Sequence, residues 1–354
     1  MSLIDREFTN LLQKVVRQVV SDPKTYRGVQ YLPAVQIPAQ NIRVDVIEAT
    51  GGLTNEHEIG TDPQYVQSFG TRTQEFQFGS YREAVHYDEQ KILFLRKLGE
   101  NDRSQRGVRQ YINEDVDRLN RRLEARMEKL RWDAIFSGSF SHLGKTASFG
   151  IPSQNLAVPI GAVWSTDLIN ANGSANPVKD IRYWVTGGLA AFRKYKITKL
   201  VMNPNTVRWI LDNANTLSYL TSYGANPKLV GYDVNTVLGL LIPGCPPVDV
   251  YEGWYQTESV DANGKISVSN ATYFLPDGKI FFEAALPGGD KIGEFVLGVN
   301  LQSGSVDDPG FGKYLIVEDK TALNPKNPYL DLIGGFQGGP KLDRSFDVLT
   351  ASVV

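Results

Sequence analysis

Residues that could carry out acid–base, nucleophilic or metal chemistry are few in this chain and widely spaced. The histidines are His57, His86 and His142, and none of these separations places two rings on one helix face as a metal pair requires. The patterns GxSxG and HExxH and the glycine signature of a dinucleotide-binding loop do not occur in the sequence. We expect His57 and His86 at the surface or on a strand face, and solvated acids in a turn-rich loop: Glu56, Glu58 and Asp62.

Two segments resemble ligand-binding loops without meeting their requirements. Residues 139–146, SFSHLGKT, have Ser139 where a phosphate-binding loop has its first glycine. That loop works because a strand delivers it to the amides of a helix N-terminus, whereas here a helical pattern comes first and ASFGIP follows. Residues 261–265, DANGK, lack the alternating acids and the distal Glu of a calcium loop. The sequence therefore predicts no catalytic residue, no cofactor and no metal site, and we expect the chain not to be an enzyme.

Composition narrows the class of protein. The chain has 354 residues, of which 42% are hydrophobic and 21% charged, as in a folded chain with one large domain or two to three small ones. The formal net charge of −2 argues against a sequence-specific DNA reader, because phosphate contacts favour a basic surplus. The single cysteine, Cys245, excludes an internal disulfide. No apolar run is long enough to span a bilayer, so we expect no membrane association, and the acidic N-terminus does not fit a signal peptide.

The elements that must position any site include one long helix, which we predict over residues 103–136. Its narrow apolar stripe lies on a charged rod of about 45 Å, which suits a helix across the face of a thin, extended molecule. A coiled-coil strand is the alternative, although the stripe ends at Ser137-Gly138. The stripe recurs at steps of three and four residues: Val108, Ile112, Val116, Leu119, Leu123, Met127, Leu130 and Ala134.

The first 45 residues predict a helix followed by an extended arm. Residues 3–20 have an amphipathic pattern whose apolar face includes Phe8 and Leu12, and Pro23 ends it. The rest of the arm, to residue 45, has no helical period. Such an arm docks either on a neighbouring subunit or on its own core, and the sequence leaves both alternatives open.

Residues 44–87 predict two long strands joined by a turn-rich tip. Phe76 and Phe78 share one face of the return strand, and the pattern changes phase after Gly79, which is typical of a β-bulge. A long hairpin is marginally stable by itself, so we expect this aromatic pair to be exposed and to contact a partner. The candidate inter-subunit contacts of the arm and hairpin are Phe8, Leu12, Phe69, Phe76, Phe78 and Tyr81.

The remaining chain predicts a mixed region of helices and strands. Asn176 can cap a helix with Pro177 in its first turn, and we expect that helix to continue through Gly187-Gly188 to residue 195. A strand over residues 196–204 and a further helix follow. Three later features complete the pattern: the hairpin turns Asn263-Gly264 and Asp277-Gly278, and a final strand over residues 345–354.

Read in order, these segments resemble the major capsid protein of tailed bacteriophages, in particular the lambda-type major capsid protein E family. RMEKLRWDAIFSG, residues 126–138, is similar to the end of the family's spine helix, and DRSFDVLTASVV to its closing strand. The segments between them are WSTDLINANGSANPVKDIRYWV, KLVMNPNTVRWILDNAN and YFLPDGKIFFEAALPGG. Together they span most of the chain from about residue 100 onward, whereas the first hundred residues agree with the family in layout alone.

The resemblance implies an α+β protein with the tailed-phage major capsid fold. Its parts would be an N-terminal arm (1–45), an extended β-hairpin loop that lies over a neighbour (46–87), a peripheral domain with the long spine helix (88–195 and 305–354) and an axial domain (196–304). The last of these would meet its symmetry mates at the centre of each capsomer.

The resemblance also implies function and partners. The chain would self-assemble into pentamers and hexamers that form an icosahedral shell around double-stranded DNA, without sequence-specific binding, in the virion. Assembly would take place in the host bacterial cytoplasm with a separate scaffolding protein and a portal, with a decoration protein left open. Two alternatives remain: the shell of a cellular cargo compartment with the same fold, and an enzyme with a β-rich substrate domain.

Overall fold

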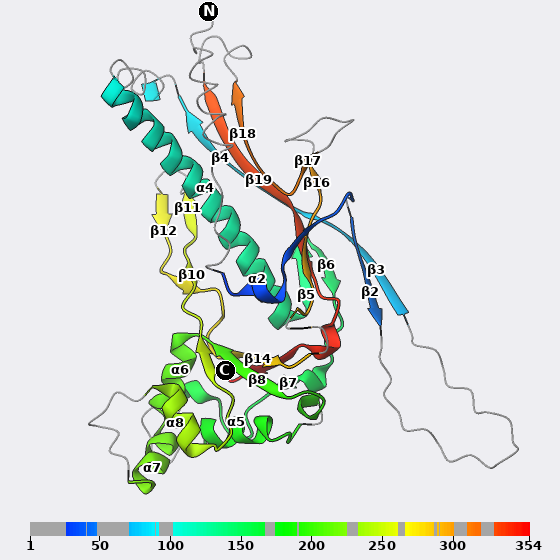
Figure 1. Cartoon of the computed structure of the whole chain (residues 1–354), viewed down its shortest axis with the longest axis vertical. Helices are drawn as coiled ribbons and strands as arrows, with labels where there is room; N and C mark the ends of the chain where they lie inside the picture. Colours follow the sequence, from blue (N-terminus) through cyan, green and yellow to red (C-terminus); the bar gives the residue numbers. More distant parts are fainter. Residues whose placement is uncertain are drawn as a thin grey trace, which may run out of the picture.

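The structure, a computed structural model of the chain, is elongated, with a long lobe above a compact lobe (Figure 1). The long lobe comprises helix α4 (Asp102–Ser137) and a sheet of long strands, and the compact lobe comprises a second sheet with several short helices. The structure describes residues 26–39, 41–47, 71–88, 90–91, 102–166, 174–189, 191–224, 233–260, 266–286, 289, 291–300, 310–319 and 329–354. The helix expected over residues 3–20 and the candidates Phe8, Leu12 and Phe69 lie outside these ranges.

The sheet of the long lobe is built around strand β19 (Leu330–Lys341), which pairs antiparallel with three others. Helix α4 lies along this sheet (Figure 1). A Cβ added at Gly334 of β19 would meet the Leu123 side chain of α4 at 3.2 Å, so the glycine lets the helix approach the strand closely. The other strands are β4 (Gly79–Tyr87), β18 (Lys313–Asp319), β15 (Glu294–Leu297) and, parallel to β15, β1 (Ala34–Gln36).

Helix α4 confirms the predicted long helix almost to the residue. Its stripe is buried as expected at Ile112, Val116, Leu119 and Leu123, and Gly138 in the left-handed region (φ 61°) follows its last residue. The expectation of a narrow stripe is correct only for the part before Leu119. Further along, a second row of side chains is also buried, because other segments of the chain cover this half of the helix: Asn120, Glu124, Glu128, Arg131, Trp132 and Ile135.

The compact lobe is organised by a five-stranded sheet in the order β7-β20-β14-β8-β9. Alternate residues of β14 face opposite sides, so Phe281 joins the core next to α4, whereas Ile280 and Phe282 join a second core with the helices. The strands are β7 (Leu156–Ala157), β20 (Leu349–Ser352), β14 (Lys279–Ala284), β8 (Ile197–Met202) and β9 (Val248–Val250). The helices are α5 (Pro177–Val185), α6 (Pro204–Leu211), α7 (Ala214–Ser222) and α8 (Val234–Leu241).

Several elements lie in a different lobe from the one that the resemblance implied. The final strand β20, expected with the long helix, pairs with β14, and Ile181 and Trp184 of α5 are buried in the second core. Strand β15, expected in the axial domain, pairs instead with β19. These placements depend on hydrogen bonds between residues far apart in the sequence, and local patterns carry no information about them.

Helix α5 begins as predicted and ends about ten residues earlier than expected. The Asn176 side chain accepts a hydrogen bond from the amide of Lys179, and Pro177 occupies the first turn. Gly187 has φ 79°, and a Cβ at Gly188 would lie 2.2 Å from the Tyr183 ring. The chain therefore turns back over the helix at the glycine pair, which ends the helix instead of lying inside it.

The predicted hairpin turns have different outcomes. Asp277-Gly278 forms a turn, but the strands on its two sides do not pair: β13 (Thr272–Tyr273) pairs with β10 (Trp254–Tyr255), and β14 pairs with β8 and β20. Instead, Asp277 accepts hydrogen bonds from the side chains of Asn203 and Asn205. Asn263-Gly264 lies outside the described residues, between the antiparallel pair β11 (Glu258–Val260) and β12 (Ile266–Val268).

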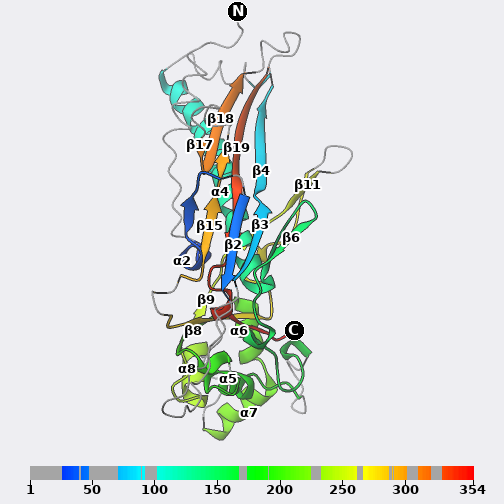
Figure 2. The same ribbon diagram turned by 90° about the vertical axis from the view of Figure 1, so that its right-hand side faces the viewer.

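The predicted extended hairpin is present as β2 (Asn41–Ile47) and β3 (Thr71–Gln77), which pair in the register Asn41↔Gln77. It projects away from the two lobes (Figure 1), and in Figure 2 it lies in front of the body, on the side that faces the viewer. The expected β-bulge at Gly79 is wrong, because β3 ends at Gln77 and β4 begins at Gly79 as a partner of β19. The phase change in the sequence therefore marks the passage of the chain from one sheet to another.

Candidate assembly surfaces and the buried junction behind them

The arm enters the body of the molecule at a four-residue helix, α2 (Gly28–Tyr31), which packs against α4. Tyr31 is completely buried, with its ring centroid 5.9 Å from Trp132 of α4 and 4.8 Å from Phe281 of β14. This one side chain therefore contacts both the spine helix and the sheet of the compact lobe. Polar groups on either side of α2 fix its position further.

The first of these groups is Glu128 of α4, whose side chain is fully buried. Its carboxylate accepts hydrogen bonds from the Gly28 amide at 2.8 Å, the Trp132 indole at 2.8 Å and the Tyr251 hydroxyl at 2.9 Å. Arg131, also buried, lies 3.4 Å away. Burial of a carboxylate is costly unless it is paired and hydrogen-bonded, and these partners from three parts of the chain meet that requirement.

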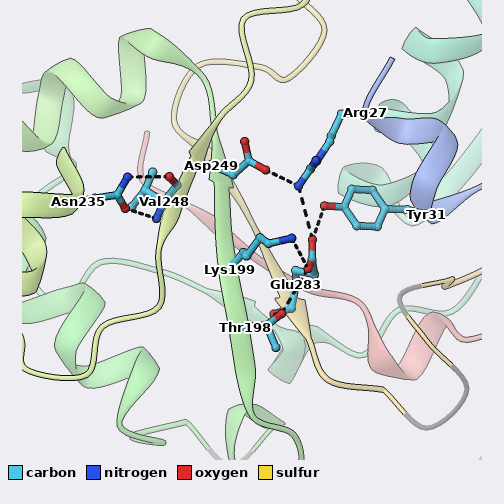
Figure 3. A network of polar contacts seen from close by, with 8 residues as sticks. All are labelled: Arg27, Tyr31, Thr198, Lys199, Asn235, Val248, Asp249 and Glu283. Atoms are coloured by element: carbon cyan, nitrogen blue, oxygen red, sulfur yellow. Dashed lines mark hydrogen bonds and ion pairs between the residues drawn. The ribbon is translucent and has the colours of Figure 1, made fainter. Parts of the chain in front are cut away.

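The second group is Glu283 of β14, shown in Figure 3. It accepts a 2.8 Å hydrogen bond from the Tyr31 hydroxyl and forms an ion pair of 3.1 Å with Lys199 of β8. Arg27 lies 3.9 Å from the same carboxylate and also pairs with Asp249 of β9. Burial and the hydrogen bond to Glu283 raise the pKa of Tyr31, so the phenol stays protonated as a donor.

The two carboxylates hold α2 from opposite sides, one from the spine helix and one from the compact lobe. Strand β9, which supplies Asp249, is itself fixed by Asn235 of α8, whose side-chain amide pairs with both the N–H and the C=O of Val248 (Figure 3). The root of the arm is therefore a hydrogen-bonded junction between the lobes.

A groove of about 450 Å³ runs between β4, α4 and the segment from β10 to β11. Arg122 lies in it, half-buried, with hydrogen bonds to Glu83 and an ion pair of 2.8 Å to Glu258. The hydrogen bond to Glu83 raises the pKa of Arg122. Arg122 belongs to the charged part of the long helix, outside its apolar stripe. The basic residues that line the groove are Arg82, Arg122, Arg126 and Lys129.

Arg126 is the cation of the groove that lacks a carboxylate partner among the described residues. Its guanidinium lies 5.7 Å from the centre of the Tyr81 ring, and Tyr81 in turn stacks on Phe336 at 4.9 Å. Burial raises the pKa of Tyr81. The aromatic base and exposed cation make this groove a surface that suits a peptide carrying carboxylates.

The expected exposed aromatic pair is buried or half-buried in the subunit. Phe78 is 5% exposed, and a Cβ at Gly298 would meet its ring at 2.5 Å. Phe76 packs 5.8 Å from Phe140 and 6.1 Å from Phe149. The exposure expected for the pair is therefore wrong, because the root of the hairpin packs onto the subunit core. Contact of any of the six aromatic and aliphatic candidates with another copy stays a prediction.

The loop-like motifs do not form ligand sites. Residues 139–146 fold as the hairpin of β5 (Ser139–His142) and β6 (Lys145–Ser148), with no helix to follow. His86 forms a 2.8 Å contact with Asp331 on the neighbouring strand, and burial raises the pKa of Cys245 to about 11. Across the described ranges, no group of His, Cys, Asp or Glu could hold a metal ion, and no helix is long and apolar enough to cross a membrane.

Sequence reasoning missed the buried junction. A usable signal was the second row on the long helix, Asn120, Glu124, Glu128 and Arg131, which follows the apolar stripe at steps of three and four. Charged residues at such spacing ordinarily indicate a solvated face. Tyr31 and Glu283 offered no local signal for their hydrogen bond, because they lie 252 residues apart.

Comparison with known proteins identifies the family. The family model described as phage major capsid protein E matches residues 9–296. The chain belongs to the phage major capsid protein E family. This capsid protein is a structural component of the virion shell, which is built by self-association of its copies. None of the curated proteins matches its sequence significantly.

Solved structures are similar to this capsid protein at low sequence identity. A crystal structure assigned as a prophage capsid protein from Escherichia coli CFT073 is 13% identical, covers 100% of both chains and has a TM-score of 0.53. The capsid of an empty GTA particle is 12% identical with a TM-score of 0.46, covering 95% of this chain and 92% of that one. The SrpI encapsulin of Synechococcus elongatus PCC 7942 is 13% identical with a TM-score of 0.38, covering 100% and 96%. The α+β fold is that of tailed-phage major capsid proteins.

Proposed function

We propose that this capsid protein forms pentamers and hexamers that build an icosahedral head shell around double-stranded DNA. The observation that carries the proposal is the β2–β3 hairpin. Among the described strands, β2 pairs only with β3, and β3 pairs only with β2. A two-stranded ribbon is marginally stable by itself. Its projection from the lobes (Figure 1) therefore favours a neighbouring subunit as the surface that supports it.

In this proposal the arm (1–45) and the extended loop (46–87) lie over neighbours beyond the segments that pack on their own subunit, which are α2, β1 and β4. The long lobe with α4 acts as the peripheral domain, and the compact lobe acts as the axial domain that meets its symmetry mates. The axial domain then includes α5 and β20, since both pack with its sheet and helices, beside the core of residues 196–284.

Charge supports a loop contact with the groove of a neighbour. Residues 48–70, at the tip of the hairpin sequence, include Glu48, Glu56, Glu58 and Asp62 and contain no Lys or Arg. The groove offers the unpaired cation Arg126 beside Lys129. Opposite charges across an interface fix its register and discourage wrong partners.

The remaining roles follow from the same shell. A separate scaffolding protein and a portal take part in assembly in the host bacterial cytoplasm, and a decoration protein could bind the finished shell. The net charge of −2 suits a shell that encloses DNA without gripping it. The protein has no enzymatic step in this role. A cargo compartment with the same fold is the alternative, and the family match favours the phage shell.

The test is the size and content of the particles. Purified protein should elute as capsomers or shells in gel filtration and show closed particles in negative-stain microscopy. Shells recovered from infected cells should protect double-stranded DNA from nuclease. A compact monomer under all assembly conditions would contradict the proposal, and particles that hold a protein cargo without DNA would favour the cellular compartment.

A further inference from the structure

The tip of the β5–β6 hairpin combines backbone strain with an exposed apolar side chain. His142 pairs with Lys145, so the loop consists of Leu143 and Gly144, with φ angles of 47° and 78°. Within the described part of the chain, Leu143 is the one residue other than glycine in the left-handed region. Its side chain is 90% exposed.

Both properties are unfavourable in the isolated subunit. Two-residue hairpin turns with two positive φ angles favour Asn, Asp or Gly at the first position, because a larger L-residue clashes with its own backbone there. An exposed leucine also forgoes the stabilisation that its burial would provide. Nothing lies within 4 Å of a Cβ placed at Gly144, so the tip stands clear of its own chain. A residue held in a sparsely populated conformation is a reason to look for a function.

The surroundings of the tip indicate which partner it meets. Beside it is a hollow of about 160 Å³, lined partly by Phe76 at the root of the extended hairpin and by Phe140 and Ala147. Strands β3 and β6 are neighbours, as both views of the ribbon suggest (Figures 1 and 2). The tip is therefore continuous with the hairpin that is proposed to lie over a neighbouring copy. A leucine offers no charge to the phosphates of enclosed DNA.

We propose that Leu143 is a contact residue between copies of this chain, whose side chain enters an apolar depression on a second copy during assembly. This inference rests on the proposed function, since it names one contact of the shell. Burial of Leu143 at that contact offsets two unfavourable features of the free subunit, the strained backbone at Leu143 and the exposure of this residue to solvent.

Two substitutions at the same position separate the contact from the fold. Leu143→Asn accepts the left-handed conformation and removes the apolar side chain, so the subunit should have an unchanged or higher thermal midpoint. Its lowest concentration for shell formation, measured by light scattering on nuclease-treated protein, should rise about tenfold or more, as expected when a leucine no longer becomes buried. Leu143→Met keeps an apolar side chain and should assemble within about twofold of the natural protein.

Tyr111→Asn is the control, because Tyr111 is also a large exposed apolar residue but lies on a regular helix, α4, outside the groove and the compact lobe, and it should assemble at the natural concentration. Assembly of Leu143→Asn at the natural concentration would overturn the inference, as would a fall in its thermal midpoint, which would mean that Leu143 serves the fold. An equal loss of assembly in Leu143→Met would also overturn it. Failure of the natural protein to assemble at all would instead contradict the proposed function, and this inference with it.

Discussion

Tyr31 and Glu283 are 252 residues apart in the chain, yet the Tyr31 hydroxyl donates a 2.8 Å hydrogen bond to the Glu283 carboxylate. Tyr31→Phe should destabilise the subunit by about 1–3 kcal/mol, because it removes a donor from a buried carboxylate and leaves the packing in place. The free energy of unfolding in urea measures this. Tyr223→Phe, at a site that is 64% exposed, should change it by less than about 0.5 kcal/mol. Equal effects at the two sites would contradict the role of the bond.

Helix α4 should respond unequally to substitutions on its different faces. Leu119→Ala and Leu123→Ala should each cost about 2–5 kcal/mol, since both side chains are buried against the sheet. Arg121→Ala should cost far less, because Arg121 is exposed. Arg122→Ala should fall between them, since it removes two carboxylate contacts. Denaturant unfolding of the four variants tests this order, and an arginine effect as large as the leucine effects would mean that the helix is packed all round.

Phe78 should matter first to folding of the subunit. The sequence pattern predicted that Phe76 and Phe78 are exposed and contact a partner, in which case their loss would impair assembly and leave the subunit folded. Because Phe78 is buried against Gly298, Phe78→Ala should instead cost about 3–5 kcal/mol and reduce the yield of soluble protein. Phe76→Ala, at a half-buried ring, should cost less. The two yields and thermal midpoints are the measurement, and a normal yield of Phe78→Ala with failed assembly would restore the earlier interpretation.

Arg126 should influence assembly more than subunit stability. Arg126→Glu reverses the charge that faces the groove without breaking an ion pair within the described residues, so the thermal midpoint should change little. If the acidic residues 48–70 of a neighbour dock there, shell formation should weaken, and the natural protein should assemble less well as salt rises from about 50 to 500 mM. Arg121→Glu, at an exposed position of α4 outside the groove and without an ion pair among the described residues, serves as the control. Equal assembly of the two variants would argue against the groove.

Local patterns predicted the elements well and their partners poorly. Helix α4 and the cap of α5 could be predicted because periodicity and Asn-Pro signals are properties of neighbouring residues. The assignment of β20 to the compact lobe could not, since its pairing with β14 joins strands separated by about seventy residues. Gly79 illustrates both the success and the failure. The sequence revealed a change of phase in the alternating pattern at this residue. Whether that change was a bulge or a passage between sheets depended on pairing with β19.

The candidate surfaces show the same difference between local patterns, which could be predicted, and long-range contacts, which could not. The sequence pointed to Phe78 as an aromatic contact, but its burial depends on Gly298, more than two hundred residues away. Glu128 was read as part of a charged face because nothing nearby in sequence reveals that Gly28 and Tyr251 supply its hydrogen bonds. The partners of Arg122 were missed for a similar reason, since its carboxylates come from β4 and β11.

The position of α2 has a mechanical consequence. A tensile force on the chain upstream of Arg27 would be transmitted to the rest of the subunit through the four residues of α2. These residues are hydrogen-bonded to Glu128 of the spine helix and to Glu283 of the compact lobe. Such a force would act on both lobes at a single pivot and would produce a torque between them. Displacement of an arm by its neighbour in the lattice would then be converted into rotation of one lobe against the other.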